Sequence, residues 1–313
     1  REKSRYKLLN SIYGIMYFEF TKGKYIRRIH MDKIILKSHG KINLSLDVLY
    51  KRDDGYHELN TIMQEIDLKD TIEIQEIDKG IEIQCNVEGV PLNNKNLVYS
   101  AWEEMVKVLG EDRGVRIIID KQIPVASGLA GGSSNAAQVL KGLNKLWKLD
   151  LSQKELMDIG VKIGADVPFC IMGGTAYGEG IGEELTRLKP FSNKMLLLAN
   201  PGIPISTVNV YNSLDLNTKE KHRDIKQIIK YIEKEDTEAL AKNMFNIMEK
   251  TVIKKHPIIA EIKEDMLKCG ALGSLMSGSG ATVFGLFDDE DKLYKCKEEL
   301  EKKVPIVIRT QTM

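Results

Sequence analysis

This sequence of 313 residues has few of the features that mark a disulfide-stabilised or membrane-bound protein. Its four cysteines are widely separated and have no C-x-x-C spacing, which argues against a zinc site and a disulfide framework. No apolar run is long enough to span a bilayer. We therefore expect a soluble, cytoplasmic protein that binds no membrane and buries its thiols in the core, namely Cys85, Cys170, Cys269 and Cys296.

Neither sign of charge is in excess. Lys plus Arg number 46 and Asp plus Glu number 45, which argues against an electrostatic interface with nucleic acid and leaves any phosphate recognition to a local site. The chain is longer than the usual single core, so two domains sharing a cleft are expected. We place them at residues 31–193 and 194–313.

Residues 1–30 mix basic and aromatic side chains but lack the long apolar stretch and cleavage site of a signal peptide. Met31 is a plausible natural start. On this reading residues 1–30 are an upstream extension or an expression artefact, and the alternative is an added strand or an aromatic packing arm.

The most informative segment is the glycine-rich run 124–135, PVASGLAGGSSN. A β-branched strand at 115–119 precedes it, and apolar residues from Ala136 to Trp147 follow at helical spacing. The first N–H groups of a helix have no intrahelical partner and carry partial positive charge, so a glycine-rich helix start can bind an anion. The run therefore predicts a nucleotide phosphate site.

Two better-known phosphate loops do not match this run. A Walker loop needs Lys and then Ser or Thr after its last glycine, whereas Gly132 is followed by Ser133, Ser134 and Asn135. A dinucleotide-binding fingerprint needs a different glycine spacing and a following parallel strand. A plain flexible turn between strand and helix is the remaining alternative, although three glycines exceed what such a turn requires.

The remaining periodicity predicts mixed helix and sheet. Alternation over 42–50 points Ile42, Leu44, Leu46, Val48 and Tyr50 to one face and Lys41 and Asn43 to the other. Further strands are expected in an antiparallel sheet at 61–68, 71–77 and 81–85, with Lys69-Asp70 as a break. Helices are expected at 96–109, 224–234, 237–250 and 257–268, and Ser152 and Glu155 are expected to form the capping box of a further helix that ends near Gly164.

Several side chains are suited to chemistry or binding. Asp166 follows a helix end and precedes Pro168, so it could be a rigidly held base, although a turn Asp that caps the backbone is the commoner case. Lys41 could support that carboxylate, or be a solvated charge. Tyr56 and His57 could stack on and hydrogen-bond a planar base, or be an exposed aromatic pair.

A second glycine loop and two polar residues complete the candidates. Ser277-Gly278-Ser279-Gly280 could bind a substrate phosphate through its amides, or simply connect two strands. Asn96 and Lys121 could border an adenine pocket, or be a helix cap and a strand-end charge.

These motifs together resemble the GHMP family of small-molecule kinases from about Ile34 onward. The matching segments are GKINL at 40–44, RDDGYHEL at 52–59, the glycine-rich run, GADVPF at 164–169 and SGSGAT at 277–282. The D-G-Y-H segment is typical of the branch that acts on a cytidine-diphosphate substrate. The chain departs from the pattern at His39-Gly40 and at Ser127.

The resemblance implies an α+β fold of two domains, the N-terminal one like ribosomal protein S5 domain 2 and the C-terminal one ferredoxin-like. It implies that ATP phosphorylates the 2-hydroxyl of 4-diphosphocytidyl-2-C-methyl-D-erythritol, with Lys41 and Asp166 as catalytic residues and Mg²⁺ as cofactor, with Ser133 as its candidate ligand. Substrate contacts are expected from Asn43, Tyr56, His57, Thr207, Tyr211, Gly278, Ser279 and Gly280. ATP contacts are expected from Asn96, Lys121, Pro124, Val125, Ala126, Ser127, Gly128, Leu129, Ala130, Gly131, Gly132, Ser133 and Ser134.

The alternatives are another GHMP kinase and a non-catalytic nucleotide-binding protein. A monomer or weak homodimer is expected.

Overall fold

The computed structural model describes residues 9–11, 14–16, 19–21, 24–26, 33–216 and 222–313. Most of residues 1–30, and Met31, lie outside the described residues, so the expectation for that segment stays a prediction. Within it, β1 (Leu9–Ser11) pairs with β2 (Gly14–Met16), and β3 (Glu19–Thr21) pairs with β4 (Lys24–Ile26).

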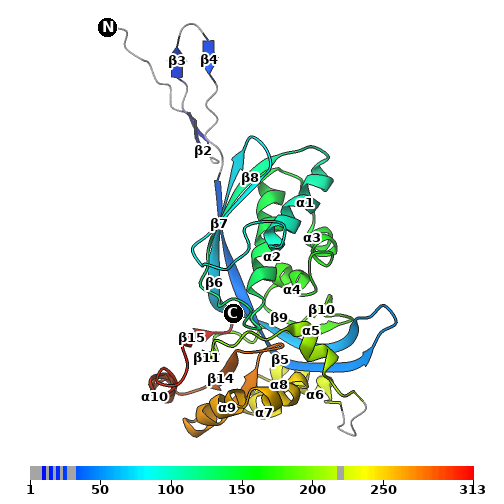
Figure 1. The fold of residues 1–313 in the computed structure, drawn as a ribbon, viewed down its shortest axis with the longest axis vertical. Helices are drawn as coiled ribbons and strands as arrows, with labels where there is room; N and C mark the ends of the chain where they lie inside the picture. The colour runs from blue at the N-terminus through cyan, green and yellow to red at the C-terminus, as the bar shows by residue number, and fades with distance from the viewer. Residues whose placement is uncertain (1–8, 12–13, 17–18, 22–23, 27–32, 217–221) are drawn as a thin grey trace.

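The described chain forms a seven-stranded and a four-stranded sheet, each covered by helices (Figure 1). The larger sheet contains β5 (Lys33–Lys51), β6 (His57–Ile77), β7 (Ile81–Cys85), β8 (Gly114–Asp120), β9 (Thr175–Glu179), β10 (Glu184–Arg187) and β12 (Phe245–Asn246). Four helices pack on it, namely α1 (Leu97–Leu109), α2 (Gly131–Leu146), α3 (Gln153–Gly160) and α4 (Val167–Met172).

The smaller sheet is antiparallel throughout, in the order β13-β14-β11-β15. Its strands are β11 (Met195–Asn200), β13 (Gly273–Met276), β14 (Val283–Phe287) and β15 (Ile306–Gln311). The helices of this half are α5 (Thr207–Asn212), α6 (Ile225–Glu233), α7 (Thr237–Asn243), α8 (Met248–Lys255), α9 (Ile258–Lys268) and α10 (Glu290–Leu300).

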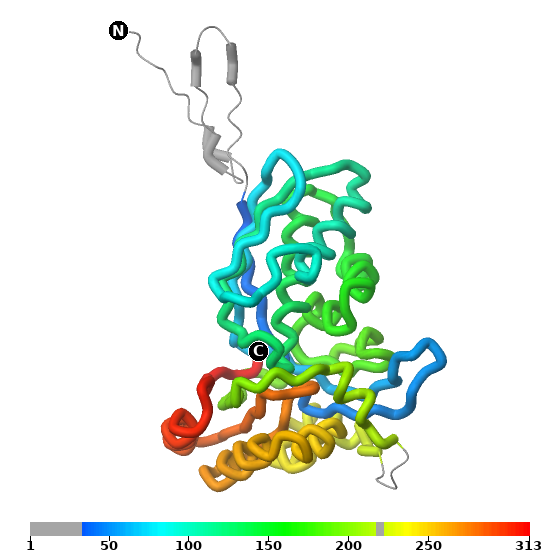
Figure 2. Tube along the Cα trace, viewed as in Figure 1, coloured from blue at the N-terminus to red at the C-terminus, as the bar shows by residue number. Residues whose placement is uncertain are grey.

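The long strand β5 connects the two halves. Ile42 and Leu44 pack in a central core shared with β11 and β14, whereas Leu46 and Val48 pack against α8 and α9. The chain end returns to the same place, where Met313 donates its backbone N–H to the carbonyl oxygen of Glu65 on β6 (Figure 2). The two halves are thus joined by strand pairing as well as by side chains. The boundary between residues 193 and 194 stays a prediction.

Local sequence signals explain most element ends. Asn96 accepts from the backbone N–H of Val98 and begins α1, and the predicted capping box between Ser152 and Glu155 is present at α3. Strand β8 lies within one residue of its predicted bounds at each end, whereas helix α2 begins at Gly131, inside the glycine-rich run and five residues before the first predicted helical position, Ala136. That run is therefore a strand-to-helix connection, as predicted.

Two strand predictions were wrong. β6 runs unbroken through Lys69-Asp70, because the buried carboxylate of Asp70 accepts hydrogen bonds and needs no turn. The sheet is not wholly antiparallel, because α1 forms a crossover that sets β7 parallel to β8. The predicted alternation over 42–50 ends at Tyr50, which is 55% exposed and lies beyond a register shift in the β5–β6 hairpin.

Several other predictions need correction. The expected helix 237–250 ends at Asn243, because Phe245 and Asn246 pair with β5 and the Asn246 amide donates to the carbonyl oxygens of Met276 on β13 and Gly278 in the second glycine loop. The short helices α4 and α5 were not expected, because six residues are too few to show a period. All four cysteines are free, but only Cys170 and Cys296 are buried, whereas Cys85 and Cys269 are partly exposed.

Candidate active site

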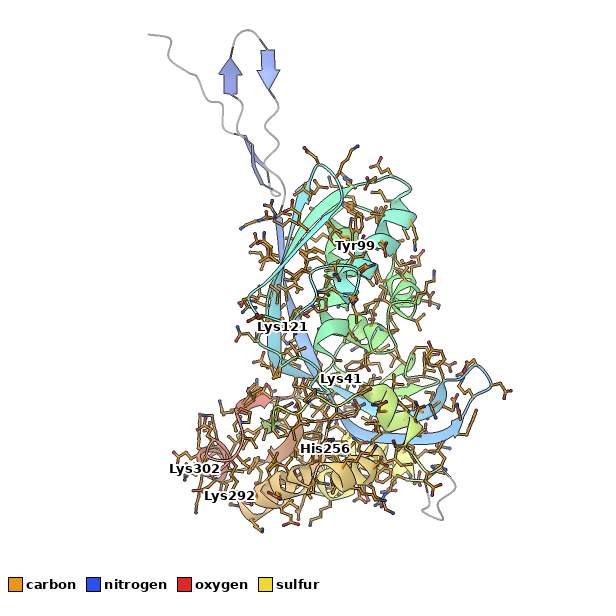
Figure 3. The ribbon with its side chains drawn as sticks, viewed as in Figure 1. Lys41, Tyr99, Lys121, His256, Lys292 and Lys302 are labelled. Carbon is orange, nitrogen blue, oxygen red and sulfur yellow. The ribbon has the colours of Figure 1, made fainter. Side chains whose placement is uncertain are left out.

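A cleft of about 710 Å³ lies where the two halves meet. Figure 3 shows Lys41 at this junction and Lys121 on the sheet side above it. The cleft is lined by the glycine-rich run, β5, β6, the start of α4, α5 and the second glycine loop. Segments far apart in sequence therefore contribute to one site.

The backbone of the glycine-rich run leaves the start of α2 open to the cleft. Ala126, Gly128 and Ala130 all have φ between 51° and 78°, in the left-handed region, so the chain turns sharply before the helix. The N-cap residue Ala130 makes no side-chain hydrogen bond, and the first turn holds no acidic residue. The free N–H groups and the helix dipole thus favour an anion at Gly131, Gly132 and Ser133.

The two glycine loops dock against each other. Ser277 Oγ donates to the carbonyl oxygen of Gly128 over 2.9 Å, and the N–H of Thr282 donates to that of Ser127 over 3.2 Å. A Cβ at position 128 would lie 2.2 Å from the carbonyl oxygen of Ser277, so only glycine fits. The second loop therefore supports the first, while Gly278, Ser279 and Gly280 also line the cleft.

Lys41 and Asp166 are brought together on the cleft wall. Lys41 Nζ lies 3.3 Å from Asp166 Oδ1 and donates to Asn43 Oδ1 over 2.8 Å. The Lys41 side chain is 6% exposed, whereas that of Asp166 is 39% exposed and faces the cleft. A buried cation thus holds a carboxylate that an incoming ligand can still reach.

Further hydrogen bonds fix this pair. Asn43 Nδ2 donates to Thr61 Oγ1 over 2.9 Å, and Thr61 Oγ1 donates to the carbonyl oxygen of Ser45 over 2.7 Å. Asp166 is the N-cap residue of α4, and Pro168 lies in the first turn of that helix. Because α4 is packed in the core, the carboxylate is held by secondary structure rather than by a loose turn.

Three aromatic side chains, Tyr56, His57 and Tyr211, also line the cleft. The rings of His57 and Tyr211 stack with centroids 5.0 Å apart and planes 24° apart, while Tyr56 is 59% exposed. Burial and the nearby charge of Lys51 lower the pKa of His57 below 6.5. Burial and the charge of Asp166 raise the pKa of Tyr211 well above its usual value, so its hydroxyl stays protonated at neutral pH.

Nearly all predicted site residues line this one cleft, including every predicted substrate contact. Two do not. Leu129 is buried in the central core, and Ser134 Oγ donates to the carbonyl oxygen of His39. Two others line the cleft but have structural partners: Asn96 caps α1, and Lys121 pairs with the buried Asp70. The hydrogen bond that Asn96 accepts from Val98 is the one expected for the alternative role of Asn96, a helix cap.

Sequence analysis missed several residues of the cleft. Thr61 and Met63 on β6, Asn135 at the start of α2, and Val90, Pro91 and Lys95 in the loop before α1 all line it. Asn135 is the last residue of the glycine-rich run, so its position in that motif could have identified it as a cleft residue. The others carry no local signal, because only the long-range pairing of β6 and the position of that loop bring them to the cleft.

The described residues contain no group of three or more His, Cys, Asp or Glu side chains that could hold a metal ion. In nucleotide sites Mg²⁺ keeps several waters and is bound mainly through substrate phosphates and one or two protein oxygens. Ser133, at the open start of α2, offers one such hydroxyl oxygen.

Comparisons with known proteins define the class. Residues 96–174 match the N-terminal domain of GHMP kinases, and residues 228–306 match the C-terminal domain. A homoserine kinase from Cytophaga hutchinsonii shares the fold at 19% identity, with a TM-score of 0.73 over 91% of this chain and 96% of that one. The chain belongs to the GHMP kinases, an ATP-using family.

Closer relatives narrow the assignment. A 4-diphosphocytidyl-2-C-methyl-D-erythritol kinase from Clostridium botulinum (strain Eklund 17B / Type B) is 47% identical over 278 residues, 89% of this chain and 99% of that protein. One from Alkaliphilus metalliredigens is 48% identical over 86% of this chain and 93% of that protein. A crystal structure of such a kinase matches with 29% identity and a TM-score of 0.75, over 89% of this chain and 99% of that one. Within the GHMP kinases, the chain belongs to the 4-diphosphocytidyl-2-C-methyl-D-erythritol kinase family.

No helix among the described residues is both long and apolar enough to cross a membrane.

Proposed function

We propose that this protein transfers the γ-phosphoryl group of ATP to the 2-hydroxyl of 4-diphosphocytidyl-2-C-methyl-D-erythritol, giving the 2-phosphate and ADP, in the non-mevalonate route to isoprenoid precursors. The observation that carries the proposal is the 3.3 Å contact between Lys41 and Asp166 in the cleft that the uncapped start of α2 also lines. The cleft therefore holds an anion site and a carboxylate base together.

In this mechanism the triphosphate lies over the start of α2, where backbone N–H groups of Gly131, Gly132 and Ser133 bind its oxygens. The carboxylate of Asp166 takes the proton from the substrate hydroxyl as the oxygen attacks the γ-phosphorus, and the bond to the β-phosphate oxygen breaks to release ADP. The ammonium of Lys41 holds the carboxylate in place and stabilises charge on the attacking oxygen.

Mg²⁺ would be held by the phosphates of ATP and by Ser133, and when bound it neutralises negative charge on the phosphates. The protein residues do the remaining work: they align the hydroxyl with the phosphorus and hold the proton acceptor. Such alignment and charge stabilisation account for most of the catalysis in phosphoryl transfer.

The pyrimidine end is proposed to bind at Tyr56, His57 and Tyr211, with Thr207 and the second glycine loop along the substrate. The His57 ring covers one face of Tyr211 in this structure. A cytosine between Tyr56 and Tyr211 therefore requires the His57 ring to move off that face, or the base to use the opposite one. Neutral His57 then offers one donor and one acceptor to the base edge.

An ADP-release assay tests the function. With Mg²⁺ and ATP, we expect turnover of 4-diphosphocytidyl-2-C-methyl-D-erythritol and none of mevalonate or homoserine. If mevalonate or homoserine is phosphorylated and the cytidine substrate is not, the protein has another GHMP kinase activity. Nucleotide binding with no turnover of any of the three would indicate a non-catalytic protein.

We also propose that the enzyme is cytoplasmic, binds no nucleic acid and is a monomer or weak homodimer.

A further inference from the structure

A buried carboxylate links the two ends of the phosphate loop, defined here as residues 121–135. Asp70 on β6 is fully buried. At the start of the loop it accepts hydrogen bonds from the backbone N–H groups of Gln122 over 2.7 Å and Ile123 over 2.8 Å. At the end of the loop it accepts from Asn135 Nδ2 over 2.8 Å.

The same carboxylate fixes a lysine beneath the loop. Lys121 Nζ lies 2.5 Å from Asp70 Oδ2, and it also lies 2.8 Å from the place where a Cβ on Gly131 would stand. The buried ammonium therefore sits directly against the first turn of α2, where the phosphate site begins. An unpaired charge there would be costly, and Asp70 removes that cost.

The network continues from the loop to the catalytic strand. Asn135 Nδ2 also donates to Ser38 Oγ over 2.9 Å, and Ser134 Oγ donates to the carbonyl oxygen of His39 over 2.6 Å. Ser38 and His39 precede Lys41 on β5. The start of α2 is thus held in register with the strand that carries Lys41, through residues that the mechanism above does not use.

We infer that Asp70 is a positioning residue for ATP. It joins the two ends of the phosphate loop and so fixes the first turn of α2 where the N–H groups of that turn can bind the phosphates. This inference deepens the proposed function but rests only on nucleotide binding at α2. Its oxygens are all engaged by the protein, so it acts through the loop and not by touching ATP.

Asp70→Asn keeps the hydrogen bonds at the start of the loop and breaks the one at its end. The amide oxygen can still accept from Gln122 and Ile123, but its new N–H₂ group faces two donors, Lys121 Nζ and Asn135 Nδ2. We expect the Kd for Mg-ADP by calorimetry and the KM for ATP to rise at least tenfold, while the KM for the cytidine substrate stays within twofold. The matched control is Asp67→Asn on the same strand, whose carboxylate pairs with Lys69 at the surface and whose loss should leave both constants within twofold.

A rescue variant keeps the test decisive. In Asp70→Asn/Asn135→Asp the donor and acceptor exchange places, so the hydrogen bond between the two positions can form again and a carboxylate remains near Lys121. We expect this pair to recover at least half of the lost ADP affinity on a logarithmic scale.

The inference is overturned if Asp70→Asn lowers only the melting temperature, or if both KM values rise equally. If Asp70→Asn does not fold, Asn135→Ala decides, because it removes the hydrogen bonds from Asn135 to Asp70 and Ser38 and leaves those from Gln122 and Ile123 to Asp70 in place: an unchanged Kd for ADP would overturn the inference, and a rise of at least fivefold would support it. Since ADP binding is read directly, failure of the wild type to phosphorylate the cytidine substrate would count against the proposed function and not against this role of Asp70.

Discussion

The hydroxyl of Ser277 donates to the carbonyl oxygen of Gly128 over 2.9 Å, so the C-terminal glycine loop is bonded to the phosphate loop of the N-terminal half. The site that the two loops form therefore depends on the close approach of two backbones, and each half of the chain supports the ligand contacts of the other.

Gly128→Ala tests this close approach. Gly128 has φ +78°, and an added Cβ would lie 2.2 Å from a backbone oxygen that has little room to move. Strain from the positive φ and overpacking together should lower the free energy of unfolding by about 3 kcal/mol or more. Gly110→Ala is the matched control, because its φ of +76° is nearly the same but nothing lies within 4 Å of the new Cβ. We expect about 1 kcal/mol there by urea denaturation; equal losses would contradict the docking of the loops.

Thr61→Val tests the support behind the catalytic lysine. Thr61 Oγ1 accepts from Asn43, which in turn accepts from Lys41, and valine has nearly the same shape without the hydroxyl. The change removes two buried hydrogen bonds, the one from Asn43 and the one to the carbonyl oxygen of Ser45. Loss of the bond from Asn43, worth about 1–1.5 kcal/mol, should lower kcat roughly tenfold if that bond is needed in the transition state. The KM for ATP should stay within twofold.

Thr71→Val on the same strand is the control for that change, because the Thr71 hydroxyl accepts from Lys37 at the surface. Its kcat should equal that of the wild type. A kcat for Thr61→Val as high as the control would show that the Asn43 link has no part in the reaction.

The pKa of His57 should reflect its partly buried position beside Lys51. This pKa is lowered by burial and by Lys51, so the ring is protonated at a lower pH in the folded protein than in the unfolded chain. Because the folded pKa is below the unfolded one, the stability that neutral His57 contributes is present above pH 6.5 and is lost as the pH falls through the folded pKa. An NMR titration of the ring should give a pKa below 6.5, and Lys51→Gln should raise it. A wild-type pKa at or above 6.5 would contradict this environment.

The sequence predicted those parts of the site whose signals are local. Lys41, Asp166 and the glycine-rich run each stand in a short motif, and the family resemblance joined them into one cleft before any contact was known. The run could be placed between a strand and a helix because Val115 and Ala136 begin clear periodic segments.

The remaining parts depend on contacts between distant residues. Asp70 looked like a turn between two strands, since nothing nearby shows that its partners lie more than 50 positions away, at Ile123 and Asn135. The break after Asn243 has the same origin, because Asn246 is drawn from a helix by carbonyl oxygens of Met276 and Gly278. Such tertiary contacts override local propensity, and a single sequence does not display them.

The most direct test of the central claim is the turnover of Asp166→Asn. Asparagine has nearly the same shape as the aspartate that contacts Lys41, but it lacks the proton-accepting carboxylate and its charge. We predict that ADP release with 4-diphosphocytidyl-2-C-methyl-D-erythritol falls by about a thousandfold or more, while the Kd for Mg-ADP stays within threefold of the wild type. A variant that keeps more than a tenth of the wild-type kcat would contradict the assignment of Asp166 as the base.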